Sequence, residues 1–394
     1  MANSNGWGDG SVNNSIGWGQ GANNSTGWGK SHLDSWSGVT DIDGGNAPVN
    51  SVAPALSGTA QEGQTLTCST GTWSGSPTYT YQWKRDGNNI TSATNSTYTL
   101  VTADVGTSIK CTVTATNFVG SATADSNTVV PVSAFTGLLD TYSGATAAYS
   151  LRQLSSTYTG NCIRVRRSSD NAEQNIGFVS NVLDTASLLT FCGAGNGFVT
   201  TWYDQSGNAN NATNSTAIAQ PQIVSSGAMI LINGKPSVQF DGSNDQLNLV
   251  TPFTADVSNY SSFVGKRAAS GRSLFALAGG DAVRYWLGLH SDNIYYLLAK
   301  PSGTYLQSSA TDTTTNQLLI TGQNNAGTMA IFKNGGTITT TNPGLGYVPI
   351  VNSIGKYAGS WTYSNIQETI FYNTNQSTNR TGIESNINTF YTIY

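Results

Sequence analysis

The carboxylates of the C-terminal two thirds of the chain are candidate catalytic groups, because enzymes hydrolyse glycosidic bonds with two facing carboxyl groups. Three glutamates follow residue 132: Glu173 after a turn, Glu368 in strand-like sequence and Glu384 in helix-like sequence. Asp204 and Asp312 are candidate acids, but neither has an evident partner in the sequence. The sequence therefore predicts no catalytic residue.

Aromatic side chains close to Asn and Asp form the second group that could bind a ligand. Sugar sites combine an aromatic platform with amide and carboxylate partners on loops. The candidate carbohydrate-binding residues on this criterion are Tyr203, Asp204, Tyr295, Tyr296 and Trp361. Trp202 and Trp286 lie in strand-like sequence, so we expect both in the core.

Metal and cofactor sites have weak support in the sequence. Asp241, Asn244 and Asp245 could offer oxygen ligands to Ca²⁺, but a β-turn explains Asp-Gly-Ser-Asn equally well, and we favour the turn. His290 has no second His or Cys near it in the sequence, which argues against a metal site. We expect neither a metal nor a cofactor.

A tryptophan repeat marks residues 1–46. Gly-Trp-Gly recurs around Trp7, Trp18 and Trp28, and Trp36 adds a fourth ring. This arm has few Leu, Ile or Val and cannot build its own core, whereas Trp often supplies much of the energy of an interface. We interpret the arm as an anchor that orders on a partner or on copies of itself; the alternative is a disordered Gly/Asn tail.

The composition is typical of an all-β protein with many turns. Charged residues make up 10% of the chain, against about 25% in an ordinary domain, and 44 of the 394 residues are glycine. A net charge of −4 without a basic stripe argues against a nucleic-acid binder. No run of about 18 apolar residues occurs, so no membrane span is expected. Arg164 and Arg166 would share one exposed or salt-bridged strand face.

Residues 47–132 have the strand spacing of a β-sandwich. Strand-like segments at 64–69, 78–85, 97–101, 108–116 and 121–130 are separated by turn residues. Trp83 lies between Cys68 and Cys111, as in an immunoglobulin sandwich. With Gly-Gln-Thr-Leu-Thr at 63–67 and Ala-Asp-Val-Gly at 103–106, the region resembles the Ig-like repeats of bacterial and phage surface proteins. Cys68 and Cys111 would then form a disulfide or two packed thiols, and both alternatives stay open.

Residues 133–394 form the largest region. The stretches 147–156, 158–171 and 198–208, the last reading Phe-Val-Thr-Thr-Trp-Tyr-Asp-Gln-Ser-Gly-Asn, resemble the catalytic domain of the fungal arabinofuranosidase B family, a concanavalin-like sandwich. The stretches 238–247 and 366–373 are similar to laminin-G-like lectin domains, and a short helix follows, for which Ser377 or Thr378 is the expected cap. Cys162 and Cys192 are a second pair that is either bridged or reduced. The expected fold class is all-β: an Ig-like β-sandwich, a larger concanavalin or laminin-G-like jelly-roll sandwich, and an extended Gly/Trp-rich arm.

The same resemblance bears on catalysis. In the arabinofuranosidase family the nucleophilic glutamate follows a Gly/His-rich stretch in the middle of the domain. The nearest counterpart here, residues 284–292, contains no glutamate. We therefore predict that residues 133–394 bind carbohydrate without cleaving it and that the protein is not an enzyme.

The order of the three regions along the chain suggests where the protein is located. An anchor arm, an Ig-like spacer and a lectin-like head together resemble fibre or decoration proteins of tailed bacteriophages. This resemblance implies a structural virion protein that is made in the host cytoplasm and displayed on the virion surface. Its expected partners are capsid or tail proteins, copies of itself in a trimer, and host-surface polysaccharide. The alternatives are a phage glycoside hydrolase or depolymerase and a purely decorative, capsid-stabilising protein.

Overall fold

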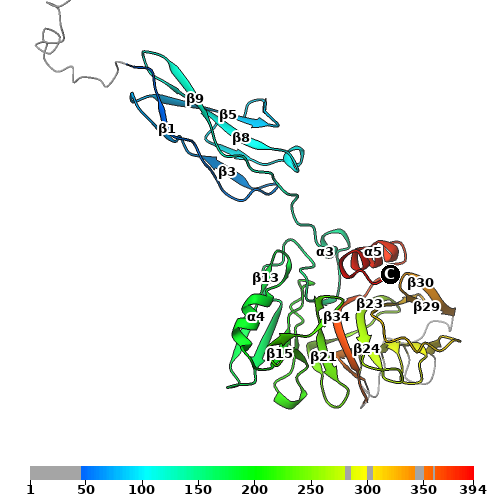
Figure 1. Ribbon diagram of the computed structural model, residues 1–394. Helices are drawn as coiled ribbons and strands as arrows, with labels where there is room; N and C mark the ends of the chain where they lie inside the picture. Colours follow the sequence, from blue (N-terminus) through cyan, green and yellow to red (C-terminus); the bar gives the residue numbers. More distant parts are fainter. Residues whose placement is uncertain (1–45, 280–284, 300–304, 342–349, 358–359) are drawn as a thin grey trace, which may run out of the picture. The chain divides into compact units, whose positions relative to one another are not determined.

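The structure, a computed structural model, describes residues 46–279, 285–299, 305–341, 350–357 and 360–394. The chain divides into two compact units, with the boundary between Ala134 and Phe135 (Figure 1). Nearly all regular structure in both units is β-strand, so the predicted all-β fold class is confirmed. The four candidate anchor residues, Trp7, Trp18, Trp28 and Trp36, lie outside the described residues, and the anchor stays a prediction.

The N-terminal unit is a sandwich of two antiparallel sheets. One sheet has the order β6-β5-β8-β9 and the other β2-β3-β7, while β1 pairs with β4. The elements are β1 (Asn50–Val52), β2 (Leu56–Ser57), β3 (Thr65–Cys68), β4 (Thr72–Trp73), β5 (Thr78–Arg85), β6 (Asn88–Asn89), β7 (Thr97–Thr99), the 3-10 helix η2 (Thr102–Asp104), β8 (Ile109–Thr116) and β9 (Ser121–Asp125). Trp83 is fully buried at the centre, where its Nε1 donates to the carbonyl of Asn95 at 2.9 Å.

The two cysteines of this unit lie together in its core. Cys68 and Cys111 are both buried beside Trp83, and all four cysteines of the chain are free thiols in this structure. A hydrogen bond between the two side chains lowers the pKa of Cys68, and the same bond together with burial raises the pKa of Cys111. The two thiols are thus already in contact, and the disulfide stays a prediction. Cys162 instead donates to the carbonyl of Ser150, at 3.4 Å.

The C-terminal unit is built on one large, nearly closed antiparallel sheet system (Figure 1). Its strands are β10 (Ala147–Ser150), β11 (Ile163–Arg167), β12 (Glu173–Ile176), β15 (Gly197–Trp202), β16 (Ala212–Thr213), β17 (Gln222–Ser225), β18 (Ala228–Met229), β21 (Val238–Asp241), β22 (Leu247–Thr254), β23 (Ser258–Arg267), β24 (Leu274–Ala278), β25 (Tyr285–Leu289), β26 (Tyr295–Ala299), β27 (Tyr305–Gln307), β28 (Leu318–Asn325), β29 (Thr328–Lys333), β30 (Gly336–Thr341), β31 (Ile350–Ile354) and β34 (Tyr363–Tyr372).

Short hairpins and helices complete the unit. The hairpins are β13 (Phe178–Val179) with β14 (Val182–Leu183), β19 (Leu231–Ile232) with β20 (Lys235–Pro236), and β32 (Lys356–Tyr357) with β33 (Ser360–Trp361). The helices are α3 (Leu138–Thr141), α4 (Thr185–Cys192), the 3-10 helix η3 (Ala217–Ala219) and α5 (Arg380–Tyr391). Among the described residues, no helix combines the length and apolar character that crossing a membrane requires.

Strand β34 is the centre of this unit. It pairs with β10, β21 and β23, and nearly every residue along it is buried. The main core fills one face, and a second cluster, which includes Ile383, Ile387 and Tyr391 of α5, covers the other. Because both faces are covered, polar side chains such as Gln367 and Glu368 are buried with their partners.

The predicted helix after 366–373 is present as α5 but begins later than expected. Asn379 is its N-cap residue, so the expectation of a cap at Ser377 or Thr378 is wrong. The amide of Ser377 is instead bonded by the Asn375 side chain at 2.9 Å. That local turn holds the residues before the helix in a non-helical conformation.

Candidate functional site

Two of the predicted sugar-binding residues follow β15. The Tyr203 hydroxyl is partly exposed and donates to Asn175 Oδ1 at 2.9 Å. Asp204 is only 3% exposed, and its carboxylate accepts backbone amides of Ala148, Ser206 and Asn210. The oxygens of Asp204 are thus used inside the fold, where they organise the loop after β15.

Two other predicted sugar-binding residues, Tyr295 and Tyr296, are neighbours on β26, and their side chains point to opposite faces of the sheet. Tyr295 is 2% exposed in the main core, and its hydroxyl donates to Asp312 Oδ2 at 2.6 Å. Asp312 also forms an ion pair with Lys333, so this candidate acid is already neutralised. Tyr296 is half-buried on the other face, where it meets a different set of rings.

Those rings form the aromatic cluster, which comprises Phe275, Trp286, His290, Tyr296 and Tyr357 from β24, β25, the turn after β25, β26 and β32. Trp286 is at its centre, with ring centroids 5.7 Å from Phe275, His290 and Tyr296 and 5.9 Å from Tyr357. Its Nε1 is buried and has no hydrogen-bond partner among the described residues. The same holds for the indole nitrogens of Trp202 and Trp361, so the unpaired donor does not by itself mark a ligand position.

The rim of the aromatic cluster is polar. The side chains of His290 and Asp292 are 49% and 41% exposed, and His290 Nδ1 lies 3.2 Å from Asp292 Oδ1. The Tyr296 hydroxyl donates to Asp292 Oδ2 at 2.8 Å. Burial opposes ionisation of Asp292, but hydrogen bonds from the Ile294 amide and Tyr296, together with His290, lower its pKa overall. Phe275 and Trp286 are core side chains, so the part of the cluster at the surface is made by His290, Tyr296 and Tyr357, beside an ionised carboxylate.

The Trp361 side chain lies on the hairpin that carries Tyr357. Residue 361 pairs with Lys356 across β32 and β33, and the Lys356 ammonium lies 5.8 Å from the Trp361 ring centroid. Trp361 is partly exposed. Because Lys356 and Tyr357 are adjacent on β32 and point to opposite faces, Trp361 lies on the face of the hairpin away from Tyr357.

A second polar feature is the acidic turn, residues 241–245, which joins β21 to β22. Asp241 Oδ1 accepts the amides of Ser243 and Asn244 at 2.8 and 3.2 Å, and Asp245 Oδ2 accepts the Asp241 amide at 2.9 Å. These side-chain-to-backbone bonds make it an Asx-type turn, in keeping with the turn that the sequence favours over a Ca²⁺ site. Within the described residues, no group of three or more His, Cys, Asp or Glu side chains could hold a metal ion.

The acidic turn carries a titratable group that is poised near neutral pH. Asp245 is 6% exposed, and burial, followed by the charge of Asp241, raises its pKa to about 7. The turn packs on the junction of β31 and β32, because a Cβ on Gly355 would lie 3.3 Å from the Asp245 carbonyl oxygen. Gly355 stands two residues before Tyr357 of the aromatic cluster. The backbone of the acidic turn is therefore close to the strand junction that leads to Tyr357.

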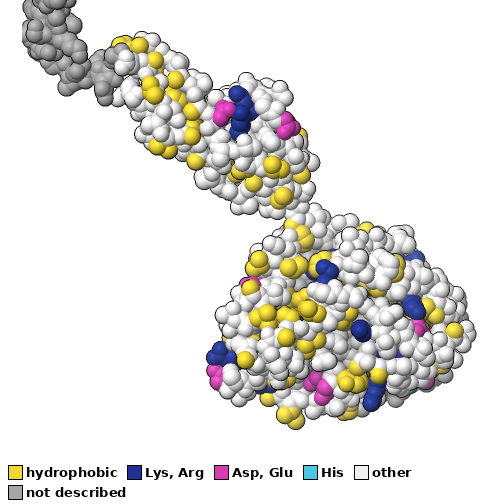
Figure 2. Space-filling model, viewed as in Figure 1, with side chains coloured by type: hydrophobic (Ala, Val, Ile, Leu, Met, Phe, Trp, Pro, Cys, Tyr) yellow, Lys and Arg dark blue, Asp and Glu magenta, His cyan; other side chains and the backbone are white. Residues whose placement is uncertain are grey.

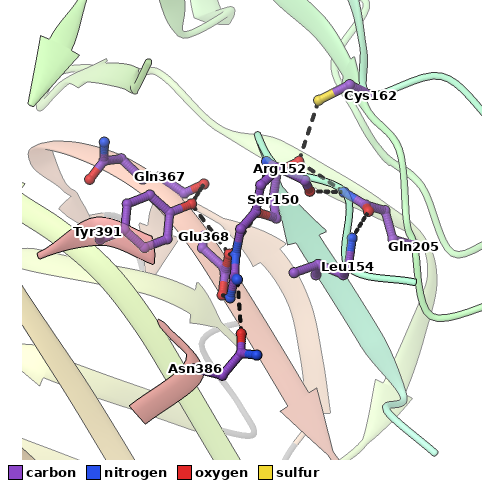
Figure 3. Close-up of polar contacts among 9 residues, drawn as sticks. All are labelled: Ser150, Arg152, Leu154, Cys162, Gln205, Gln367, Glu368, Asn386 and Tyr391. Atoms are coloured by element: carbon purple, nitrogen blue, oxygen red, sulfur yellow. Dashed lines mark hydrogen bonds and ion pairs between the residues drawn. The ribbon is translucent and has the colours of Figure 1, made fainter. Parts of the chain in front are cut away.

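All three glutamates of this unit are paired with arginine. Glu173 pairs with Arg164 on the exposed strand face, where a salt-bridged face is predicted, and Glu384 pairs with Arg380 along α5. Glu368 is fully buried on β34, and Figure 3 shows Arg152 reaching it from the loop after β10. None of the three is an unpaired carboxylate.

The buried pair in Figure 3 is fully hydrogen-bonded. Arg152 Nε and Nη2 donate to the two Glu368 oxygens at 2.8 and 3.0 Å, and Ser150 Oγ donates at 2.7 Å. The Tyr391 hydroxyl lies 3.2 Å from Glu368 Oε2, and Arg152 Nη1 donates to Asn386. The network ties β10, β34 and α5 together, so we assign it a structural role.

Comparison with known families gives one match. Residues 140–244 match the family described as "Alpha-L-arabinofuranosidase B, catalytic". This range contains the three stretches on which the resemblance to that family rests, and it ends at the acidic turn. A search of curated proteins gives no match.

Several solved structures are similar to the chain at low identity. One is "GH54 a-l-arabinofuranosidase soaked with cyclic sulfate inhibitor", at 17% identity and a TM-score of 0.49, with 62% of each chain covered. Others are the SAP-like pentraxin of Limulus polyphemus (14%, TM-score 0.30, 38% of this chain and 79% of that one) and the sialidase CBM40 of Ruminococcus gnavus (13%, TM-score 0.29, 38% and 95%). The chain thus spans about three fifths of the length of the arabinofuranosidase.

The family match corrects one expectation. We predicted from the missing glutamate in residues 284–292 that the protein is not an enzyme, and the match to a catalytic family contradicts this. The absence of glutamate from this stretch was a poor guide, because the stretch contains the aspartate Asp292, which contacts Tyr296 of the aromatic cluster. The resemblance to the arabinofuranosidase B family itself is confirmed.

The sequence missed the aromatic cluster as a site. We predicted from the sequence that Trp286 lies in the core, and its 2% exposure confirms this. We considered His290 only as a metal ligand. Tyr357 meets Trp286 from 71 positions along the chain. The spacing of residues within one strand or turn cannot predict a contact between residues so far apart in the sequence.

Proposed function

We propose that the C-terminal unit is a glycan-acting domain of the arabinofuranosidase type that hydrolyses glycosidic bonds. The observation that carries this proposal is the match of residues 140–244 to the catalytic family. The aromatic cluster supports it, since an aromatic face with polar groups at its rim is the surface that sugar rings bind.

The proposal assigns two carboxylates. Glycoside hydrolysis needs one carboxylic acid to protonate the leaving oxygen and one carboxylate to attack the sugar or activate water. Asp245 is the candidate acid, because its pKa is raised to about 7, and Asp292 is the candidate carboxylate, because its pKa is lowered. Environments that push two pKa values apart in this way are typical of such a division of roles.

The substrate class we propose is a glycan with α-L-arabinofuranosyl groups, and 4-nitrophenyl α-L-arabinofuranoside is the first substrate to test. The full chain should release 4-nitrophenol, and Asp245→Asn and Asp292→Asn should each lower kcat by about 10² or more. Asp170→Asn is the matched control, because Asp170 lies on an exposed turn in an ion pair with Arg167 and should leave the rate within about twofold.

Two results would overturn this proposal. Release of 4-nitrophenol at the rate of buffer alone, confirmed on polymeric arabinan, would remove the hydrolytic function. Full activity in both Asp245→Asn and Asp292→Asn would leave hydrolysis standing but remove these residues from it.

We further propose that the protein is a virion component that presents this unit to host polysaccharide. The support is the order of parts in the sequence: a Gly-Trp-Gly arm with Trp7, Trp18, Trp28 and Trp36, an Ig-like unit, and a carbohydrate-type unit. Capsid or tail proteins and a homotrimer are the partners we propose. Mass spectrometry of purified particles tests the placement, and a particle proteome without this chain would refute it.

A further inference from the structure

A cavity of about 390 Å³ lies in the C-terminal unit, apart from the aromatic cluster and the acidic turn. Its wall comes from the loop after β10, the β13–β14 and β19–β20 hairpins, β18, the first residue of α4 and the end of α5. The lining residues are Leu151, Val182, Leu183, Thr185, Met229, Leu231, Gly234, Lys235, Pro236, Phe390 and Tyr391. Its volume lies within the range of small-molecule sites, which is about 300–1,000 Å³.

The wall of this cavity is held by buried polar contacts, so the cavity is preformed. Gln367 Nε2 donates to the carbonyls of Ile232, Lys235 and Pro236 at 3.1–3.3 Å and so fastens the β19–β20 hairpin to β34. Tyr391 lines the cavity, while its hydroxyl contacts Glu368 in the network of Figure 3. A ligand would therefore not have to order the walls on binding.

Nearly the whole lining is apolar, and part of it is open to solvent. Leu231 and Val182 are 51% and 39% exposed at the edge, while Leu151 and Leu183 are buried in the floor. Figure 2 shows hydrophobic side chains gathered on one face of the C-terminal unit with single basic side chains beside them. An apolar surface of this kind is a site for the apolar body of a ligand.

One charge stands in this apolar lining. The Lys235 ammonium lies 4.1 Å from the centroid of the Phe390 ring and forms no ion pair with a described residue. The other face-on cation at Phe390 is Arg152, at 4.9 Å, and its charge is neutralised by Glu368. Asp184, the carboxylate next to the lining residue Thr185, is used at the N-terminus of α4, where it accepts from the Ser187 amide at 3.0 Å.

We propose that this cavity binds a small amphipathic anion, with an apolar body in the cavity and one carboxylate at Lys235. An aromatic or aliphatic carboxylate fits both features, since the lining repels polar groups and the single cation lacks a counter-charge. A free sugar fits poorly, because the lining offers few hydrogen-bonding side chains. The cavity is thus a second site, independent of the proposed glycosidase.

Displacement of the fluorescent probe 1-anilinonaphthalene-8-sulfonate from the full chain tests the proposal. Octanoate, octanol and octylammonium share one apolar body and differ in charge. Octanoate should displace the probe about tenfold more tightly than octanol, and octylammonium should bind weakest. Lys235→Gln should remove the tenfold preference and leave the affinity for octanol within about twofold.

A variant that fills the cavity separates this site from other apolar surface. Leu231→Trp should abolish displacement by all three ligands, whereas Val250→Trp, on exposed β22, should change nothing. A cooperative thermal transition near that of the wild type shows that each variant is folded. Equal binding of octanoate and octanol by the wild type would overturn the proposal, as would unchanged binding in Leu231→Trp. A dimer that Leu231→Trp dissociates would mean that a second copy covers the cavity, and it would overturn the proposal as well.

Discussion

Replacing Arg152 by methionine is the sharpest test of how the C-terminal unit is held together. Glu368 has no exposed surface and receives four hydrogen bonds, two of them from Arg152 and the others from Ser150 and Tyr391. The Arg152→Met variant keeps a side chain of similar length against Phe390 but leaves a buried carboxylate without its counter-charge. Such a loss costs about 3–5 kcal/mol.

Thermal unfolding of the full chain measures this cost with an internal reference. At roughly 2–4 °C per kcal/mol, the transition of the C-terminal unit should fall by about 10 °C, while that of the N-terminal unit should not move.

Two further variants decide whether the reasoning is right. Arg164→Met removes an exposed pair, whose arginine and glutamate side chains are 44% and 34% exposed, and should cost less than about 1 kcal/mol. The double variant Arg152→Met/Glu368→Gln should recover at least half of the loss, because it removes the buried charge. A shift in Arg152→Met no larger than that in Arg164→Met would refute the argument, and so would a double variant less stable than the single one.

Three other predictions follow from single sites. The pKa of Asp245 in the folded protein, about 7, lies above its ordinary value of 3.8, so the stability contributed by the protonated form is full below about pH 4 and is lost as the pH rises through 7. Asp245→Asn should therefore stabilise the unit increasingly up to pH 7, by at most about 4 kcal/mol. Denaturation at several pH values measures this difference. Gly355 has φ +84°, and an added Cβ would lie 2.4 Å from the Phe240 ring, so Gly355→Ala should cost about 2 kcal/mol or more in urea unfolding. Alkylation of the unfolded, non-reduced chain followed by mass measurement should label Cys68 and Cys111 if they are thiols, and protection of both would show that they are bridged.

The strands of the N-terminal unit were readable from the sequence because each carries its own alternation. The predicted segment 78–85 has the same bounds as β5, and the predicted segment 108–116 begins one residue before β8. The segment 121–130 was predicted too long, since β9 ends at Asp125. After Asp125, the Ser126 hydroxyl donates to the carbonyl of Asn127. The alternation of hydrophobic residues cannot predict such a local bond.

The candidate site was predictable only in parts. Trp286 was assigned to the core and the acidic turn to a β-turn, and both assignments depend on local sequence. The approach of the turn to the strand junction that leads to Tyr357 depends on Gly355, more than a hundred positions after the turn. Asp204 was a candidate sugar ligand because its sequence neighbours are aromatic, while one of its partners, the amide of Ala148, comes from β10, 56 positions earlier in the chain.

The distribution of charge narrows the chemistry that the C-terminal unit can perform. Each of its three glutamates is neutralised by an arginine, and Asp312 is neutralised by Lys333. If the unit hydrolyses glycosides, as its family match supports, the acid and its partner must then be aspartates. The pKa of Asp245 is raised and that of Asp292 is lowered, and Asp292 contacts Tyr296 of the aromatic cluster, so these two aspartates are the ones we propose. Hydrolysis that survives the loss of both would assign the reaction to another carboxylate, and Asp241, whose charge raises the pKa of Asp245 in the acidic turn, is the next residue to replace.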